Sequence, residues 1–269
     1  MVAIVKLLAA LSFFLVAQAF PAAEDFSLVS RSKLTTGPGS MCSTKKFDIV
    51  KLFPADLNGH GGPPIDSPVA KYPTFVTLSV GYQNYSCLDN GTWFGIGAVT
   101  QLFDISCIPQ NTIQNFTTLV SKYWEAAGPG VSPQEVIDLA GASAFSMGIH
   151  YWIPSPLDPT NPLAINAIWD FRQQRMQTDV NVKRAWVLSA GDGKVPAPTN
   201  GTFDAPWNDS YRLSINGTEQ GGLAAQIYRI NSNDGNTPPG TCTPGIPQKQ
   251  VKSTLNFWFY GGDWAHTIF

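Results

Sequence analysis

The sequence has few of the residues on which common catalytic and metal-binding motifs depend. Its three histidines, His60, His150 and His266, never stand four residues apart on a helix or in an H-x-H pair. Its four cysteines form no C-x-x-C pair, and the segment around Ser189 lacks the glycine-x-serine-x-glycine pattern of a lipase nucleophile. We therefore expect no metal site and no cofactor.

Charged residues are also scarce, at 13% of the chain, and they are nearly balanced, with 17 Lys and Arg against 19 Asp and Glu. No basic patch or acidic tail stands out, so binding to nucleic acid or to a membrane surface lacks its usual electrostatic basis. The 24 glycines and 21 prolines indicate many turns, and the 12% of aromatic residues suits strands.

The N-terminus has the three-part layout of a secretory signal peptide. Lys6 precedes an apolar run over residues 7–16, and Ala17-Gln18-Ala19 gives a small-x-small cleavage site. The run is too short to span a bilayer comfortably, and no later stretch is apolar enough to span. We predict a signal peptide over 1–19, an irregular arm over 20–72, and a single β-rich domain over 73–269.

Six N-x-Ser/Thr sequons behind a signal peptide predict an N-glycosylated, secreted protein. They begin at Asn84, Asn90, Asn115, Asn200, Asn208 and Asn216. The last three lie eight residues apart, so we expect that whole segment to face solvent.

The four cysteines, Cys42, Cys87, Cys107 and Cys242, predict two disulfides in an oxidising compartment. Three pairings are possible. Loop length alone favours Cys87 with Cys107, which leaves Cys42 with Cys242.

The first clear strand covers residues 74–87, where apolar side chains alternate with polar ones. Val80 and Tyr82 belong to the apolar face, which we expect to point inward. Asn90-Gly91 is a favoured turn pair, so a second strand over 94–105 completes a hairpin. Period-two patterns return from residue 147 to the end.

Between these strands the period changes to that of a helix over 111–127, and Ser132-Pro133-Gln134-Glu135 has the pattern of a capping box that begins a second helix. We therefore predict a mainly β fold, an antiparallel β-sandwich or a barrel-like domain, with a short helical insertion over about 111–146.

Few residues are candidates for chemistry. His150 could act as a general base, although a histidine in such a strand is more commonly a hydrogen-bonded structural residue. Asp104 could supply a carboxylate for glycoside hydrolysis, as could Asp170, Asp192 and Asp204, but the sequence pairs no two of them. Aspartates among glycine and proline, such as Asp192 and Asp204, commonly make turns.

Tryptophans at loops and strand ends suggest sugar binding, because an exposed indole stacks on a sugar ring. They are Trp93, Trp152, Trp169, Trp186, Trp207 and Trp264. Our candidates for a ligand platform are Trp152 and Trp207, while core packing explains most of the others.

Seven segments, taken together, resemble a family of secreted proteins of unknown function, the domain of unknown function numbered 3455 (DUF3455). They are "LSVGYQNYSC", "GAVTQLFDISC", "GIHYW", "KVPAP", "APWNDSYRL", "AAQIYRINSNDGNTPPGTC" and "STLNFWFYG", and they cover roughly residues 73–261 in the family's order. Members occur in filamentous fungi and bacteria, so the resemblance implies a fungal source and a β-rich secreted domain. It implies no particular activity.

The resemblance also bears on the disulfides and on one label. Bacterial relatives keep the cysteines that match Cys87 and Cys242, which implies Cys87 with Cys242 and Cys42 with Cys107.

Fungal members often carry the label "malate dehydrogenase", but the nearest glycine-rich segment here, Gly95-Ile96-Gly97, lacks a third glycine and continues as a β pattern.

We therefore expect an extracellular binding or cell-wall-associated protein whose ligand is a polysaccharide or another small extracellular molecule. One alternative is an extracellular enzyme, a glycan hydrolase or an isomerase/cyclase, that uses His150 and an aspartate. Another is a host-directed secreted factor. The sequence indicates no nucleic-acid partner and no membrane span.

Overall fold

The computed structural model describes residues 42–59, 63–142, 144, 146–172 and 184–263. Within them, eight antiparallel strands close into a barrel in the order β1-β10-β9-β6-β5-β4-β3-β2. The strands are β1 (Phe75–Cys87), β2 (Trp93–Asp104), β3 (Ser146–Pro154), β4 (Ile165–Asp170), β5 (Trp186–Val195), β6 (Trp207–Arg212), β9 (Gln226–Asp234) and β10 (Lys249–Tyr260). Of the two predicted architectures, the barrel is the one observed, and the helices lie between β2 and β3 as expected.

The predicted strand alternation is present in β1, but its direction is reversed. Val80 belongs to the apolar cluster that the helices cover, and Tyr82 packs against that cluster from the outside of the barrel. The polar face points inward, where the Ser79 hydroxyl donates a hydrogen bond to the Thr100 hydroxyl at 2.7 Å. The expectation that Val80 and Tyr82 point into the barrel is therefore wrong. The apolar face of β1 is buried on the outside of the barrel, because the helices cover the sheet there.

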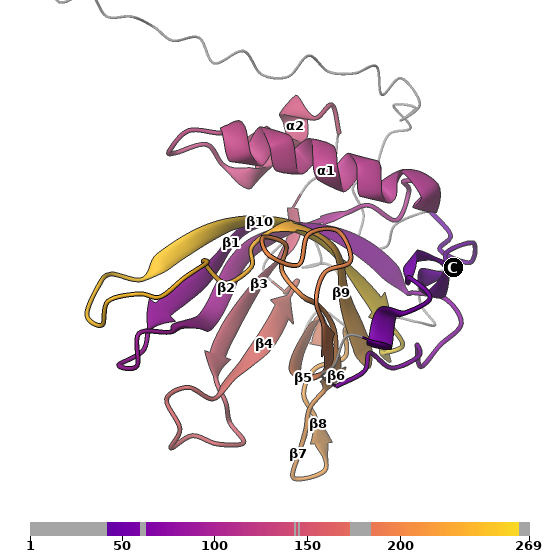
Figure 1. Cartoon of the computed structure of the whole chain (residues 1–269). Helices are drawn as coiled ribbons and strands as arrows, with labels where there is room; N and C mark the ends of the chain where they lie inside the picture. The colour runs from indigo at the N-terminus through magenta and orange to yellow at the C-terminus, as the bar shows by residue number, and fades with distance from the viewer. Residues whose placement is uncertain (1–41, 60–62, 143, 145, 173–183, 264–269) are drawn as a thin grey trace, which may run out of the picture.

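That outer layer is α1 (Gln110–Ala126), which packs across β10, β9 and β1 (Figure 1). The indole Nε1 of Trp124 donates to the Gly81 carbonyl at 3.0 Å and fixes the helix to β1. At the helix end, the ammonium of Lys252 donates to the carbonyls of Trp124 at 2.6 Å and Ala127 at 2.9 Å. A cation at the carbonyls of the helix C-terminus also complements the helix dipole.

The second helix, α2 (Pro133–Leu139), begins as the sequence predicts. The backbone N–H of Glu135 donates to the Ser132 hydroxyl, and the Glu135 carboxylate accepts from the backbone N–H of Ser132 at 2.6 Å. Its buried Val136 and Ile137 join the same apolar cluster as α1.

One end of the barrel is filled by aromatic side chains. The rings of Phe75 and Phe259 stack with centroids 4.4 Å apart, and Phe171 packs beside them. Room for Phe171 comes from Gly148, where a Cβ atom would lie 1.7 Å from the Phe171 ring. This packing makes a closed floor, so access to the barrel interior is from the other end.

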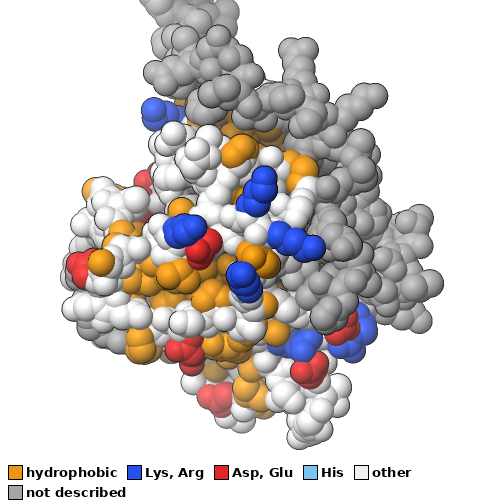
Figure 2. Space-filling model, turned by 90° about the vertical axis from the view of Figure 1, so that its right-hand side faces the viewer, with side chains coloured by type: hydrophobic (Ala, Val, Ile, Leu, Met, Phe, Trp, Pro, Cys, Tyr) orange, Lys and Arg blue, Asp and Glu red, His pale blue; other side chains and the backbone are white. Residues whose placement is uncertain are grey.

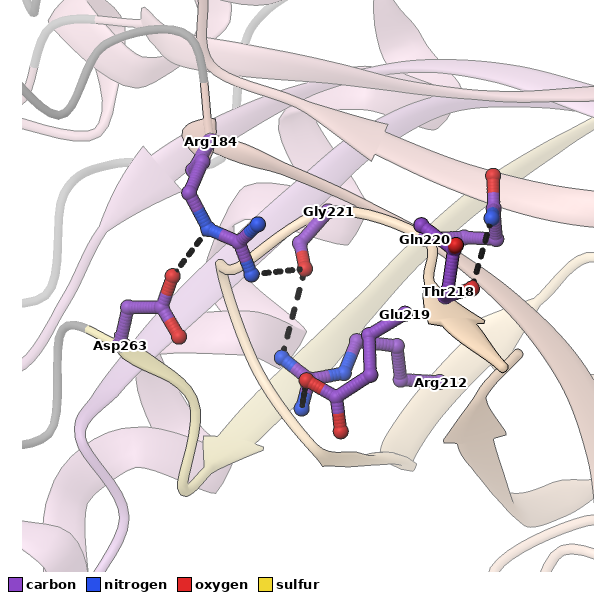
Figure 3. A network of polar contacts seen from close by, with 7 residues as sticks. All are labelled: Arg184, Arg212, Thr218, Glu219, Gln220, Gly221 and Asp263. Atoms are coloured by element: carbon purple, nitrogen blue, oxygen red, sulfur yellow. Dashed lines mark hydrogen bonds and ion pairs between the residues drawn. The ribbon is translucent and has the colours of Figure 1, made fainter. Parts of the chain in front are cut away.

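Polar contacts hold the connection between β6 and β9 against the closed end (Figure 3). This connection contains the hairpin of β7 (Ser214–Ile215) and β8 (Thr218–Glu219). The carbonyl of Gly221 accepts from Arg184 at 3.1 Å and from Arg212 at 3.3 Å. The two arginines also form ion pairs, Arg184 with Asp263 and Arg212 with Glu219.

The disulfides join Cys42 to Cys107 and Cys87 to Cys242. This is the pairing implied by the family resemblance, and the pairing favoured by loop length is wrong. Cys87 ends β1 at the open end, and Cys242 belongs to the connection between β9 and β10. The barrel brings these two segments together although 155 residues separate them. Loop length could not indicate this, because closure of a barrel pairs its first and last strands.

The face on the right-hand side of Figure 1 carries hydrophobic patches with Lys and Arg side chains among them and scattered Asp and Glu (Figure 2). No helix of the described residues is long and apolar enough to cross a membrane.

Candidate functional site in the barrel cavity

The open end of the barrel leads into a cavity of about 620 Å³. Residues of β1, β2, β3, β4, β5, β6 and β9 line it. A smaller space of about 30 Å³ lies deeper, and Trp152, Asn208 and Arg229 line both spaces. A concave site of several hundred Å³ is of the size that holds a small organic molecule.

One wall of the cavity carries a row of three polar side chains. Lys194 on β5 is the register partner of Asn208 on β6, and Asn208 is the partner of Arg229 on β9. Direct partners in antiparallel strands point to the same face of the sheet, and adjacent strands are about 4.8 Å apart. All three residues line the cavity, so the row presents two cations with an amide between them.

Arg229 is the least compensated charge of this row. Its Nε donates to the Pro206 carbonyl at 2.9 Å. Among the residues that the structure describes, no carboxylate oxygen lies within 4.0 Å of its guanidinium, and no other hydrogen bond to it is found. Burial lowers the pKa of Arg229 to about 10, so the group is still a cation at neutral pH.

The pKa of Lys194 is also lowered by its surroundings. Partial burial and then the positive charge of Arg229 lower the pKa of its ammonium. Two like charges that face one cavity repel each other, and an anion between them would relieve the repulsion.

The opposite wall is aromatic. It is formed by Tyr85 on β1, Trp93 and Phe94 on β2, and Trp152 on β3. The Tyr85 hydroxyl donates to the Gly235 carbonyl at 2.8 Å, which fixes its ring at the rim. The fully buried Nε1 of Trp152 has no hydrogen-bond partner among the residues that the structure describes. This wall offers flat apolar faces to a bound molecule.

His150, Trp169 and Phe257 line the deeper space. The Nδ1 of His150 lies 2.8 Å from the Ile168 carbonyl, so Nδ1 carries the proton and Nε2 bears the lone pair. Burial lowers the pKa of His150 to about 3, and the imidazole is therefore neutral at physiological pH. The indole Nε1 of Trp169 is buried and has no hydrogen-bond partner within the described part of the chain.

The structure separates the candidates named from the sequence. Trp152 and His150 line the barrel interior, whereas Trp207 is buried in the outer layer, where its ring centroid lies 6.4 Å from that of Phe53. Asp104 is the partner of Thr77 at the closed end of β2, and its Oδ1 accepts from the backbone N–H of Ser106 at 2.8 Å. His150 pairs instead with Thr100, so the two proposed catalytic residues are not brought together.

The other aspartates are equally dispersed. Asp170 forms an ion pair with Arg172 at 2.6 Å, and Asp204 accepts a hydrogen bond from the backbone of Asp234 at 2.8 Å. Of the four aspartates named above, only Asp192 lines the cavity. The described residues thus hold no pair of these carboxylates that faces the cavity from two sides.

Asp192 also belongs to a group with Asp66 and Asp209, whose carboxylate oxygens lie within 4.8 Å of one another. Such a group could hold a divalent cation. Asp209 is buried and already accepts hydrogen bonds from the Gly193 backbone at 2.8 Å and from Gln226 at 3.0 Å.

The sequons differ in their surroundings. Asn90, Asn115, Asn200 and Asn216 are exposed, and Asn84 is half-buried at the rim of the cavity. Asn208 lines the cavity itself, and Ala205, Trp207, Asp209 and Ser210 are buried, so the expectation that the whole segment 200–216 faces solvent is wrong. A glycan on Asn208 would have to occupy the cavity.

Some predictions concern residues outside the described ranges. These are the signal peptide over 1–19, His60, His266 and Trp264. Sequence reasoning did not single out Lys194 or Arg229, although both lie in family segments, "KVPAP" and "AAQIYRINSN". One signal was available in the sequence. Arg229 lies two residues after Ile227, so a cation shares a strand face with an apolar residue. Only barrel closure shows that this face is the interior.

A family model described as "Protein of unknown function (DUF3455)" matches residues 68–261. The chain therefore belongs to this family, as its segments suggested. No curated protein and no solved structure matches it.

Proposed function

We propose that this protein is a secreted, N-glycosylated binding protein whose barrel cavity holds a small extracellular molecule. The observation that carries this proposal is the cavity of about 620 Å³, with an aromatic wall and a polar wall above a closed floor. Because the floor is closed, the cavity accepts a whole small molecule or the end of a chain. An internal segment of a polysaccharide does not fit, because the chain would have to leave the cavity through the closed floor.

The test uses a cavity-filling variant of the secreted protein. A Cβ atom at Gly191 would meet no heavy atom within 4 Å, and Gly191 lines both spaces of the cavity. Gly191→Leu therefore fills the site without a backbone clash. Gly128 also has open space around it but lies in the loop after α1, so Gly128→Leu is a matched control.

The neutral dye Nile red serves as the probe, and its fluorescence is titrated with each protein. We expect one dye per chain for the wild type and for Gly128→Leu, and loss of binding for Gly191→Leu. Equal binding by all three proteins would contradict a ligand site in the cavity. Depletion of the protein by insoluble chitin, β-glucan or cellulose, unaffected by Gly191→Leu, would point to a polysaccharide surface elsewhere.

A second function is favoured by the position of His150. Its imidazole lines the deeper space beneath the cavity with the lone pair on Nε2, but a pKa lowered to about 3 makes it a weak base, so a general-base role in an isomerase or cyclase would need a bound substrate that raises this pKa. For an enzyme, His150→Ala should abolish turnover and leave Nile red binding and the fold intact. An unfolded His150→Ala variant would indicate a structural role for this residue.

A further inference from the structure

We infer that the row Lys194, Asn208 and Arg229 binds the anionic group of the ligand, and that the ligand is a small aromatic carboxylate. This inference rests on the proposed function, because it specifies the molecule that the cavity would hold.

Arg229 is half-buried, and a charge that has lost part of its water is normally given a counter-charge or further hydrogen bonds in return. The guanidinium of Arg229 has one hydrogen bond, from Nε to a carbonyl, which leaves its two terminal nitrogens for another partner. No carboxylate of the described residues supplies that partner. The guanidinium lines the cavity, so the missing partner would arrive with the ligand.

The register makes this a site of defined shape. Asn208 lies between the two cations and lines the deeper space as well. A planar carboxylate matches the fork of a guanidinium with two parallel hydrogen bonds, and the Asn208 amide and the Lys194 ammonium add donors beside it. Asp192 also lines the cavity, but its carboxylate belongs to the group with Asp66 and Asp209.

The body of the ligand follows from the opposite wall. Trp93 and Trp152 line the cavity across from the cations, and the ammonium of Lys249 lies 5.9 Å from the centroid of the Trp93 ring. Flat rings stack well on indole faces. An aromatic ring that carries one carboxylate satisfies both walls.

The test is displacement of Nile red from the secreted protein by 2-naphthoate and by 2-naphthamide, which have the same shape but differ in charge. The variants are Arg229→Gln, which keeps one donor for the Pro206 carbonyl, and Arg184→Gln as a control. Arg184 lies in the network at the closed end, away from the cavity.

We expect the wild type and Arg184→Gln to bind the carboxylate at least about tenfold more tightly than the amide. Arg229→Gln should lose this preference, with the affinity for the amide within about twofold of the wild type. 2-Naphthyl phosphate compares a dianionic head group, and tighter binding of the phosphate than of the carboxylate would overturn the assignment of a carboxylate ligand.

Equal displacement by carboxylate and amide, or a carboxylate preference that survives in Arg229→Gln, would overturn the inference. So would Nile red binding that neither compound displaces. In these cases Nile red binding that depends on Gly191 would still support the proposed function. Loss of that dependence would overturn the proposed function itself. If Arg229→Gln does not fold, the comparison of carboxylate with amide on the wild type decides the inference alone.

Discussion

The imidazole of His150 is stacked on the indole of Trp169, with ring centroids 4.6 Å apart and an angle of 18° between the planes. Phe257 meets the imidazole edge-on at 5.0 Å. The histidine is therefore enclosed by aromatic rings at the bottom of the cavity. Its one hydrogen bond within the described residues, to the Ile168 carbonyl, fixes the neutral tautomer.

This enclosure predicts a pH-dependent stability. The pKa of His150 is lowered to about 3 in the folded chain, against about 6.5 in the unfolded chain. The unfolded chain therefore takes up this proton first as the pH falls. The stabilisation is fully present above about pH 6.5, and the free energy of unfolding should fall by about 1.4 kcal/mol per pH unit between pH 6 and pH 4.

Urea unfolding at several pH values measures this slope. In His150→Gln, the slope of the free energy of unfolding against pH should be smaller by the contribution of about one proton. The slope that remains comes from the carboxylates. A histidine NMR titration of the wild type gives the pKa directly, and a value near 6.5 would contradict the burial argument.

Gly148 should not tolerate a methyl group. In Gly148→Ala the added Cβ atom would lie 1.7 Å from the Phe171 ring, which must move out of the closed floor. We expect a loss of about 1–3 kcal/mol in the free energy of unfolding, as for other overpacked cores. Gly128→Ala, in open space, should change stability by less than about 0.5 kcal/mol. Equal effects of the two substitutions would show that the floor can repack.

The disulfide between Cys87 and Cys242 should stabilise the open end of the barrel. Replacing both cysteines by serine is expected to cost about 2–4 kcal/mol, since the bond closes a long loop. Non-reducing peptide mapping of the wild type should recover the Cys87 and Cys242 peptides together. Recovery of Cys87 with Cys107 would refute the observed pairing.

Glycan occupancy should divide the sequons by their surroundings. We expect glycans at the exposed Asn90, Asn115, Asn200 and Asn216, and none at Asn208, whose side chain faces the cavity. Mass spectrometry after enzymatic deglycosylation in heavy-oxygen water marks each occupied asparagine. A largely occupied Asn208 would mean that a sugar fills the cavity, which would contradict binding of a free small molecule there.

Removal of the Arg229 charge should stabilise the ligand-free protein. Arg229→Met keeps the length of the side chain and removes a cation that lacks a counter-charge, so its melting temperature should rise by a few degrees. Arg212→Met is the control, because Arg212 has an ion pair with Glu219 and should lose stability. A melting temperature that falls in both variants would indicate that Arg229 acts as a structural residue.

Local patterns determined much of the secondary structure. The alternation in β1, the Asn90-Gly91 turn and the capping box at Ser132 each depend on neighbours within a few residues, and each predicted element is present. Which face of β1 points inward was beyond such patterns. Alternation distinguishes two faces, and only the position of α1 decides that the apolar one is covered from outside.

Short-range periodicity and composition predict a β-rich chain with a helical insertion and four cysteines, because these features depend only on residues close together in the chain. The tertiary structure decided the disulfide pairing, the inward face of each strand and the site. Lys194, Asn208 and Arg229 become neighbours only through strand register. Register depends on contacts between segments far apart in the chain, and barrel closure then places these residues opposite Trp152 across one cavity.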